Sequence, residues 1–265
     1  MVVVTTSQDK KEQIELGQKL ATEIDCPFVL RKQQRLSQMM RDLSLQGIIV
    51  VETQQVTLQT REGPSFYFHP NMVKHRAHAF LKDQPDVMVK AMNLEPGLKV
   101  LDCTLGLGSD ALITSLVVGK AGQVVGLEAS TVIAVLVKNG LRNYPWESLP
   151  VVGKPLAEAA NRIEVINQDH REVLKRLPAN SFDIVYFDPM FQETIPSSKG
   201  IAILRHWGWN QTLDPSLLLE AARVARKRVV VKVKRGSQEF NRLGLRQVIE
   251  GGRRISYGIL SVKEG

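Results

Sequence analysis

An apolar strand that runs directly into a glycine turn constrains this chain more than any other feature. The strand ends in Asp102, and Gly106 and Gly108 follow it closely. Glycine supplies the positive φ and the close backbone approach that both tight strand-to-helix turns and nucleotide-binding loops need. A second apolar segment, residues 123–127, ends at Glu128, twenty residues after the last loop glycine. This spacing predicts a unit that binds a nucleotide-containing cofactor.

The rest of the pattern predicts a parallel doubly wound sheet. Apolar strands alternate with helical segments, and such alternation places helices on both faces of a parallel sheet. Apolar segments on either side of a glycine pair then predict a closing antiparallel hairpin. The proline-rich residues 143–155 are expected to form a loop. The expected strands are residues 100–102, 123–127, 162–167, 182–187 and 228–234, the hairpin is 246–262, and the expected helices include 86–94, 111–118, 170–177 and 215–225.

Residues 1–68 predict a small α/β domain ahead of a larger domain over residues 69–265. A chain of 265 residues with 43% hydrophobic content is long enough for two unequal cores. The small domain is expected to brace the larger one or form a homodimer contact, with substrate docking as the alternative. Its expected helices are residues 8–24 and 35–45, and its expected strands are 27–30, 48–52, 55–60 and 66–68.

The end of the strand at residues 182–187 separates two cofactor classes, the dinucleotides and S-adenosylmethionine (SAM). This strand opens directly into Asp188 and Pro189, with Phe191 two residues later. The Asp188 carboxylate and the Pro189 carbonyl can accept hydrogen bonds from a planar NH2 group, and Phe191 can stack on the ring that carries it. A dehydrogenase has no need of this set. The pattern therefore favours a SAM-dependent methyltransferase that acts on an exocyclic amine, with Asp188, Pro189 and Phe191 as its catalytic residues.

The Asp-Pro-Met-Phe segment at residues 188–191 resembles the RsmJ family, which methylates the exocyclic amine of one guanine in bacterial small-subunit ribosomal RNA. Most amine methyltransferases have a second proline at the third position. The resemblance covers about residues 70–262 and implies a Rossmann-like methyltransferase fold, SAM as the cofactor, and ribosomal RNA or the small ribosomal subunit as the partner. Further similar segments are residues 73–76, 106–111, 218–232 and 252–257.

The glycine loop and the resemblance together predict the cofactor site. Glu128 should bind the ribose hydroxyls, Asp102 the methionine part and Asp169 the adenine amino group. The family carries an arginine where this chain has Ser109. The expected cofactor-binding residues are Asp102, Thr104, Gly106, Leu107, Gly108, Ser109, Asp110, Glu128, Ala129, Asp169, His170 and Asp188.

The charge of the chain suits a polyanionic partner. The formal net charge is +8, which fits RNA, although many basic proteins bind no nucleic acid. Lys232 and Lys234 alternate with valines, as expected at a half-exposed strand end. Each basic residue taken alone also fits a solvated surface charge. The candidate substrate or RNA contacts are His75, Arg76, Lys199, Arg205, Lys232 and Lys234.

Several classes of protein are disfavoured by the sequence. Two cysteines provide neither a disulfide framework nor metal-ligand spacing, and no segment resembles a signal peptide or a membrane span. We therefore expect a cytoplasmic protein without a metal. Two alternatives stay open: a SAM-dependent N-methyltransferase that acts on DNA, a protein side chain or a small planar amine, and a non-catalytic module that binds SAM or RNA.

Overall fold

The computed structural model describes residues 1–61, 65–189, 207, 213–245, 247–251 and 254–262. The chain forms two compact units. The first unit comprises Met1–His69, Ser130–Pro145 and Ile195–Gly208, and the second comprises Pro70–Ala129, Trp146–Thr194 and Trp209–Gly265. The predicted boundary at residue 69 stays a prediction, since the first unit also takes in chain segments far beyond it.

The first unit is built on a four-stranded sheet with the order β1-β2-β3-β4, in which β1 and β2 are parallel and the other pairs antiparallel. The internal strand β2 is fully buried, and its last four residues are β-branched. The elements of the first unit are β1 (Val2–Thr6), α1 (Lys11–Ile24), α2 (Leu36–Asp42), β2 (Gly47–Val51), β3 (Val56–Thr60), β4 (Phe66–Tyr67) and α6 (Thr131–Asn143).

Two strands of this unit differ from expectation. The run of valines and threonines in β1 was not predicted as a strand, yet it pairs along its whole length with β2. The predicted strand at residues 27–30 is reduced to a single bridge between Val4 and Phe28. The Val4 N–H donates to the Pro27 carbonyl and the Val29 N–H donates to the Val4 carbonyl, both at 2.9 Å, but Pro27 has no backbone N–H with which to extend the pairing.

Helix α6 belongs to the first unit, although it follows a strand of the second. It packs against α1 and β3, and Lys138 on α6 forms an ion pair with Glu23 on α1 at 3.9 Å. The Phe68 ring lies directly over Gly140 of α6, so closely that a Cβ at this position would overlap it. A glycine here allows the aromatic ring to approach the helix backbone.

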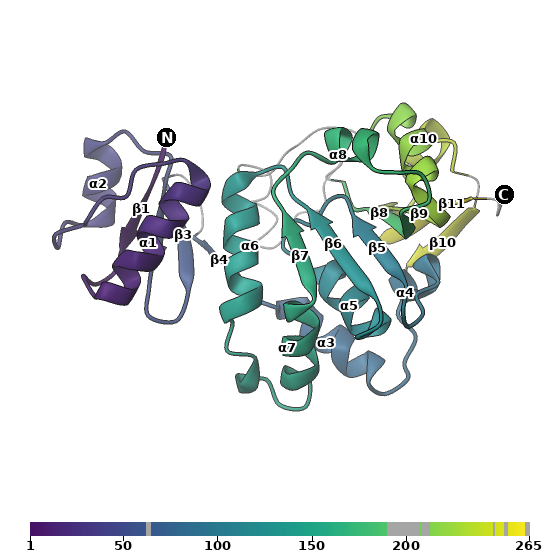
Figure 1. Ribbon diagram of the computed structural model, residues 1–265, viewed down its shortest axis with the longest axis horizontal. Coiled ribbons are helices and arrows are strands. Elements are labelled where there is room, and N and C mark those ends of the chain that lie inside the picture. Colours follow the sequence, from purple (N-terminus) through teal and green to yellow (C-terminus); the bar gives the residue numbers. More distant parts are fainter. Residues whose placement is uncertain (62–64, 190–206, 208–212, 246, 252–253, 263–265) are drawn as a thin grey trace. The chain divides into compact units, whose positions relative to one another are not determined.

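The second unit is a seven-stranded sheet with the order β10-β11-β9-β8-β5-β6-β7 (Figure 1). Its strands are β5 (Lys99–Asp102), β6 (Gln123–Leu127), β7 (Ile163–Ile166), β8 (Phe182–Phe187), β9 (Ala225–Lys234), β10 (Gln247–Gly251) and β11 (Ile255–Ser261). Its helices are α3 (Asn71–Phe80), α4 (Val87–Met92), α5 (Ser109–Val118), the 3₁₀ turn η1 (Trp146–Ser148), α7 (Gly153–Asn161), α8 (His170–Arg176), α10 (Pro215–Val224) and α11 (Glu239–Arg242).

Five strands of this sheet are parallel, and β11 pairs antiparallel with both β9 and β10. This confirms the predicted doubly wound sheet with its closing hairpin. The chain proceeds outward from β5 through β6 to β7, then returns to β8 beside β5. The switch between β5 and β8 is where open α/β sheets bind their ligands, outside the carboxyl ends of the strands.

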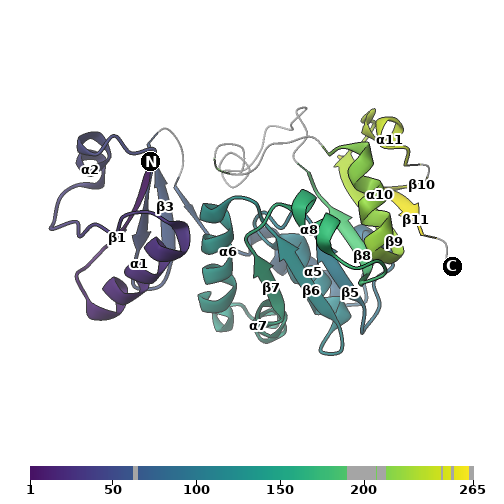
Figure 2. The ribbon, with the colours of Figure 1, turned by 45° about the horizontal axis from the view of Figure 1, so that its top comes forward.

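The sheet carries helices on both faces, as the alternation of elements predicts. Leu174 of α8 and Leu217 of α10 join Leu101 and Val185 in one apolar cluster, while α5 packs over β5, β6 and β7. Figure 2 shows α8 and α10 on the opposite side of the sheet from α5. Among the described residues, none of the helices has the length and apolar character needed to cross a bilayer.

Two segments of this region were predicted wrongly. Residues 71–80, which are not among the helices expected above, form α3. Residues 143–155 were expected as a loop, yet they contain η1 and the start of α7. Pro155 lies in the first turn of α7, where a proline removes no helical hydrogen bond, so the prolines were misleading.

Candidate active site

The predicted site residues converge on one edge of the second unit's sheet. Asp102 ends β5, Glu128 follows β6, Asp169 follows β7 and Asp188 follows β8. Lys232 lies near the end of β9. Because these five strands are parallel, their carboxyl ends meet, and residues spread over 131 positions of sequence come together at the switch point.

The glycine loop is held against the end of β6. Gly106 and Gly108 adopt φ of 51° and 74°, the left-handed region that favours glycine, and Gly108 is the N-cap residue immediately before α5. The Gly106 N–H donates to Glu128 Oε2 at 3.0 Å. The loop and the acidic residue twenty positions later are thus joined in the folded chain. Leu107, Ser109 and Ala129, also predicted, are half-buried beside them.

Thr104 joins the ends of β5 and β8. Its N–H donates to Asp102 Oδ1 at 3.0 Å, and its Oγ1 accepts the Asp188 N–H at 2.6 Å. The Asp102 carboxyl is buried, and this burial raises its pKa to about 8. Burying a carboxylate is costly unless a cation or hydrogen-bond donors compensate it. Asp102 is therefore suited to a cationic ligand group.

We expect Asp102→Asn to stabilise the protein in the absence of ligand. The raised pKa means that the folded state resists ionisation, so the wild type loses stability as the pH rises from about 4 to about 8. Asparagine carries no such cost, and the gain should reach at least about 1 kcal/mol at pH 8. Thermal unfolding at pH 5 and pH 8 tests this, and an equal gain at both values would contradict it.

A network of charges links Asp188 to the interior of the site. The Lys232 Nζ lies 2.7 Å from Asp188 Oδ2 and 2.9 Å from Asp110 Oδ2. Asp110 also accepts a hydrogen bond from the Tyr186 hydroxyl at 2.7 Å. The second oxygen of Asp110, Oδ1, accepts a hydrogen bond from Arg76 Nη1 at 2.5 Å. One carboxylate thus holds two cations and a hydroxyl.

Arg76 is itself fixed by a second carboxylate. Its Nε and Nη2 donate to the two oxygens of Asp86 at 2.7 and 3.1 Å, the two-pronged geometry that suits a guanidinium. Asp86 also caps the N-terminus of α4 through the Val89 N–H. Arg76 on α3 therefore connects the start of α4 to the Asp110 carboxylate on α5.

The pKa shifts follow from these contacts. Burial alone would raise the pKa of Asp110, but Lys232 and Arg76 lower it well below its ordinary value. Burial raises the pKa of Asp188, and Lys232 opposes that rise. Burial would lower the pKa of Lys232, yet the carboxylates of Asp188 and Asp110 raise it. Lys232 is accordingly a permanent cation between two carboxylates.

The structure separates the predicted RNA contacts into groups. His75 and Lys234 are exposed, as a contact to RNA requires. Arg76 and Lys232 instead engage carboxylates inside the site, so their charges are already compensated. Met190 to His206 lie outside the described residues, and with them Phe191, Lys199 and Arg205.

Asp169 and His170 begin α8 beyond the end of β7. Asp169 caps the helix, and both of its carboxylate oxygens accept hydrogen bonds from Arg171. The Arg171 hydrogen bonds lower the pKa of Asp169. The His170 ring packs edge-on against Phe187, with centroids 5.7 Å apart. Their predicted contacts with the cofactor stay predictions.

Sequence reasoning missed Asp86 and Tyr186. Asp86 precedes an apolar helical segment, which is a helix-capping signal that could have been found. Tyr186 was included only as part of the strand expected at residues 182–187. A hydroxyl in such a strand needs a partner, but nothing in the sequence indicates that the partner is Asp110.

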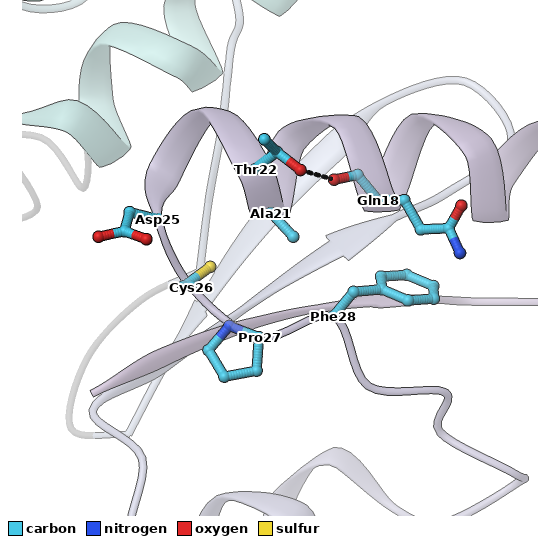
Figure 3. Close-up of a pocket in the computed structure, with 7 residues that line it drawn as sticks. All are labelled: Gln18, Ala21, Thr22, Asp25, Cys26, Pro27 and Phe28. Carbon is cyan, nitrogen blue, oxygen red and sulfur yellow. Dashed lines mark hydrogen bonds between the residues drawn. The ribbon is translucent and has the colours of Figure 1, made fainter.

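A pocket of about 590 Å³ lies in the first unit, at the end of α1 (Figure 3). Its wall includes Cys26, whose pKa is raised by burial and by the Asp25 carboxylate. The thiol therefore stays protonated at neutral pH and is a weak nucleophile. The lining residues are Gln18, Ala21, Thr22, Asp25, Cys26, Pro27 and Phe28.

The family of this chain follows from its similarity to known proteins. Residues 30–252 match the model of a family described as "putative SAM-dependent methyltransferase", which is most of the chain. The chain belongs to this family. The methyltransferase identity agrees with the glycine loop, the acidic strand ends and the closing hairpin, and it makes SAM the cofactor.

The relatives of this methyltransferase align with it either over nearly the whole chain or over about half of it. The uncharacterized protein YpiP of Bacillus subtilis is 37% identical over 259 residues, 98% of each chain. The ribosomal RNA small subunit methyltransferase J of Hydrogenovibrio crunogenus is 32% identical over 136 residues, which is 50% of this chain and 47% of that protein. Its counterpart in Francisella tularensis subsp. novicida is 34% identical over 126 residues, 46% of this chain and 48% of that protein.

A SAM-dependent methyltransferase from Neisseria gonorrhoeae has a similar structure. It has a TM-score of 0.66, covers 100% of this chain and 97% of its own, and is 18% identical. At this identity the likeness establishes the methyltransferase fold and leaves the substrate open.

Proposed function

We propose that this methyltransferase modifies the exocyclic amine of a guanine in small-subunit ribosomal RNA. The observation that carries the proposal is the position of Asp188 and Pro189, which follow the buried strand β8 at the switch point of the sheet. A carboxylate and a carbonyl in sequence there offer two acceptors to the two N–H groups of a planar amine. The partial relatives named ribosomal RNA small subunit methyltransferase J support the choice of substrate.

The distribution of charge also favours a polyanionic substrate bound by the larger part of the chain. Residues 1–69 contain eight basic and eight acidic residues, so the whole net charge of +8 belongs to residues 70–265. Lys and Arg supply most of the affinity for phosphate backbones. The neutral N-terminal segment fits a bracing role better than an RNA-docking role.

The residues of the site fit SAM. Glu128 is a buried carboxylate at the end of β6, the place from which this fold binds ribose hydroxyls. Asp102 is a buried carboxylate suited to an ammonium group, which SAM carries on its methionine part. We propose that these two residues and the loop from Thr104 to Gly108 hold the cofactor. When bound, SAM supplies an electrophilic methyl group.

Asp188 contributes orientation more than proton transfer. Hydrogen bonds from the amine to Asp188 and to the Pro189 carbonyl fix the plane of the NH2 group and direct its lone pair. The nitrogen becomes acidic once it is methylated, so its proton can leave late, to Asp188 or to water. Positioning then provides most of the rate. A guanine must also be unstacked to enter, which favours a loop or an incompletely assembled subunit.

The test is methyl transfer from radiolabelled SAM to small ribosomal subunits and to deproteinised small-subunit RNA, both from a strain that lacks this gene. We expect label in guanine methylated on its exocyclic amine, identified by nucleoside mass spectrometry. Parallel reactions contain DNA, a protein fraction and free guanine nucleosides. Label only in one of these, or in no acceptor while SAM still binds, would reject the proposal.

Glu128→Ala is expected to weaken SAM binding about 10- to 100-fold, since a hydrogen bond to a charged group contributes about 1.5–3 kcal/mol. It also removes the acceptor that holds the Gly106 N–H. Isothermal titration calorimetry with SAM measures the change. Glu164→Ala, an exposed position on the neighbouring strand β7, is the matched control and should bind as the wild type does. Equal affinities of the two variants would remove Glu128 from the cofactor site.

A further inference from the structure

We infer that Lys232 and Asp110 form a positioning pair for Asp188, in which the lysine ammonium holds the Asp188 carboxylate in the orientation that receives the substrate amine. The inference rests on the proposed amine methylation and assigns a role to two residues that had been expected to contact RNA and cofactor.

The contacts between the three residues are short and directional. Lys232 Nζ donates to Asp188 Oδ2 at 2.7 Å and to Asp110 Oδ2 at 2.9 Å. An ammonium has three donors and no acceptor, so two of its protons are engaged by carboxylates. The Asp188 backbone is held as well, because its N–H donates to Thr104 Oγ1. Asp188 is therefore fixed at its backbone and at one carboxylate oxygen.

Exposure increases along the chain of contacts. The side chains of Asp110, Lys232 and Asp188 are 11%, 18% and 39% exposed. The inner end is anchored, since Asp110 also binds Arg76 and the Tyr186 hydroxyl. The outer end is the carboxylate that a ligand can reach. Asp110 and Lys232 can therefore hold Asp188 from inside the protein while its carboxylate stays accessible to a substrate.

Lys232 is needed because it offsets the negative charges of Asp110 and Asp102, which lie near the Asp188 carboxyl. The charged and titratable groups around it come from six elements: Asp110 on α5, Arg76 on α3, Asp102 on β5, Tyr186 on β8, Lys232 on β9, and Tyr257 on β11 opposite Lys232. Burial raises the pKa of Asp188, and Lys232 is the largest opposing influence, ahead of Arg76. Without Lys232 the carboxyl should take up a proton more readily and lose its strength as an acceptor.

The first experiment measures the ionisation of Asp188 directly, without any substrate. Protein with ¹³Cγ-labelled aspartate is titrated by NMR, and the Asp188 signal is assigned by its loss in Asp188→Asn. In Lys232→Met the titration midpoint should rise by about 1–3 pH units, the effect of removing an opposite charge at this distance. Lys227→Met, at the exposed far end of the same strand, should leave the midpoint unchanged.

The second experiment is the pH profile of methyl transfer to the RNA acceptor. Because activity requires ionised Asp188, the acidic limb for Lys232→Met should move to higher pH. At low pH the activity should fall about tenfold for each pH unit by which the limb moves. The loss should shrink as the pH rises. Lys232→Arg, which keeps the charge, should recover the wild-type limb in part. A purely structural role would lower activity equally at every pH.

The outcomes separate the two proposals. An unchanged NMR midpoint in folded Lys232→Met overturns the positioning role, whatever the substrate is. If that variant does not fold, Lys232→Gln gives the same test with a polar neutral side chain. Failure of the wild type to methylate any RNA, together with a raised NMR midpoint in the variant, would reject the proposed substrate and keep the pair.

Discussion

Asp188→Asn is expected to lower kcat for methyl transfer by about 10²- to 10³-fold, the usual cost of removing one preorganised polar contact at a reacting centre. The carboxamide keeps the shape of the side chain but replaces one acceptor oxygen with an N–H donor. That donor would face the Lys232 ammonium, 2.7 Å away in the wild type, or the substrate amine. Single-turnover transfer from labelled SAM measures the loss.

The binding of SAM distinguishes this effect from general damage to the site. Its affinity for Asp188→Asn should change by less than about tenfold, since the ribose and methionine contacts lie elsewhere. Asp83→Asn, at an exposed position with positive φ that asparagine also adopts, is the matched control and should retain full activity. A variant at Asp188 with kcat within tenfold of the wild type would mean that another group receives the amine.

Arg76→Met is expected to lower the free energy of unfolding by about 2 kcal/mol. Removing one member of a buried ion pair costs about 3–5 kcal/mol, and partial exposure of Arg76 reduces this. The change leaves Asp86 and Asp110 without the guanidinium that both contact. Urea unfolding of the protein without ligands measures the difference at pH 7.

The loss of stability in Arg76→Met should also depend on pH, in a direction set by the lowered pKa of Asp110. Arg76 and Lys232 lower the pKa of Asp110 against the effect of burial, so the stabilisation is complete above the ordinary aspartate pKa and is lost as the pH falls through the lowered value. The deficit of Arg76→Met should therefore be largest near neutral pH and shrink toward about pH 3. Arg176→Met, which removes an exposed pair with Glu172 on α8, should cost less than about 1 kcal/mol at every pH. A similar cost for both variants would contradict the importance of the Arg76 contacts.

The sequence was sufficient for those parts of the site that follow a strand directly. Asp102, Glu128 and Asp188 each stand at the end of an apolar run, so their position at the carboxyl edge follows once the strands are parallel. The order of elements likewise predicted the doubly wound sheet and its hairpin. Local pattern and topology carried these predictions, and neither depends on side-chain contacts.

The partners of the basic residues could not be predicted in this way. Arg76 and Asp110 are 34 positions apart, and Lys232 and Asp110 are 122 apart. Periodicity indicates that Lys232 occupies a particular face of its strand but not what covers that face. A positive charge that a buried carboxylate compensates resembles, in sequence, one that awaits a phosphate. The same applies to Pro155, whose effect depends on its place in a helical turn.

The assignment of α6 to the first unit determines where this chain can be truncated. A chain that began at residue 70 would retain α6 but lose α1, β3 and the Phe68 ring, against which that helix packs. Six residues of α6 that are buried in the complete chain would then lack part of their cover. Residues 1–69 therefore cannot be removed without exposing part of the apolar face of α6. The Bacillus subtilis relative aligns over 98% of both chains, so the similarity extends over both units.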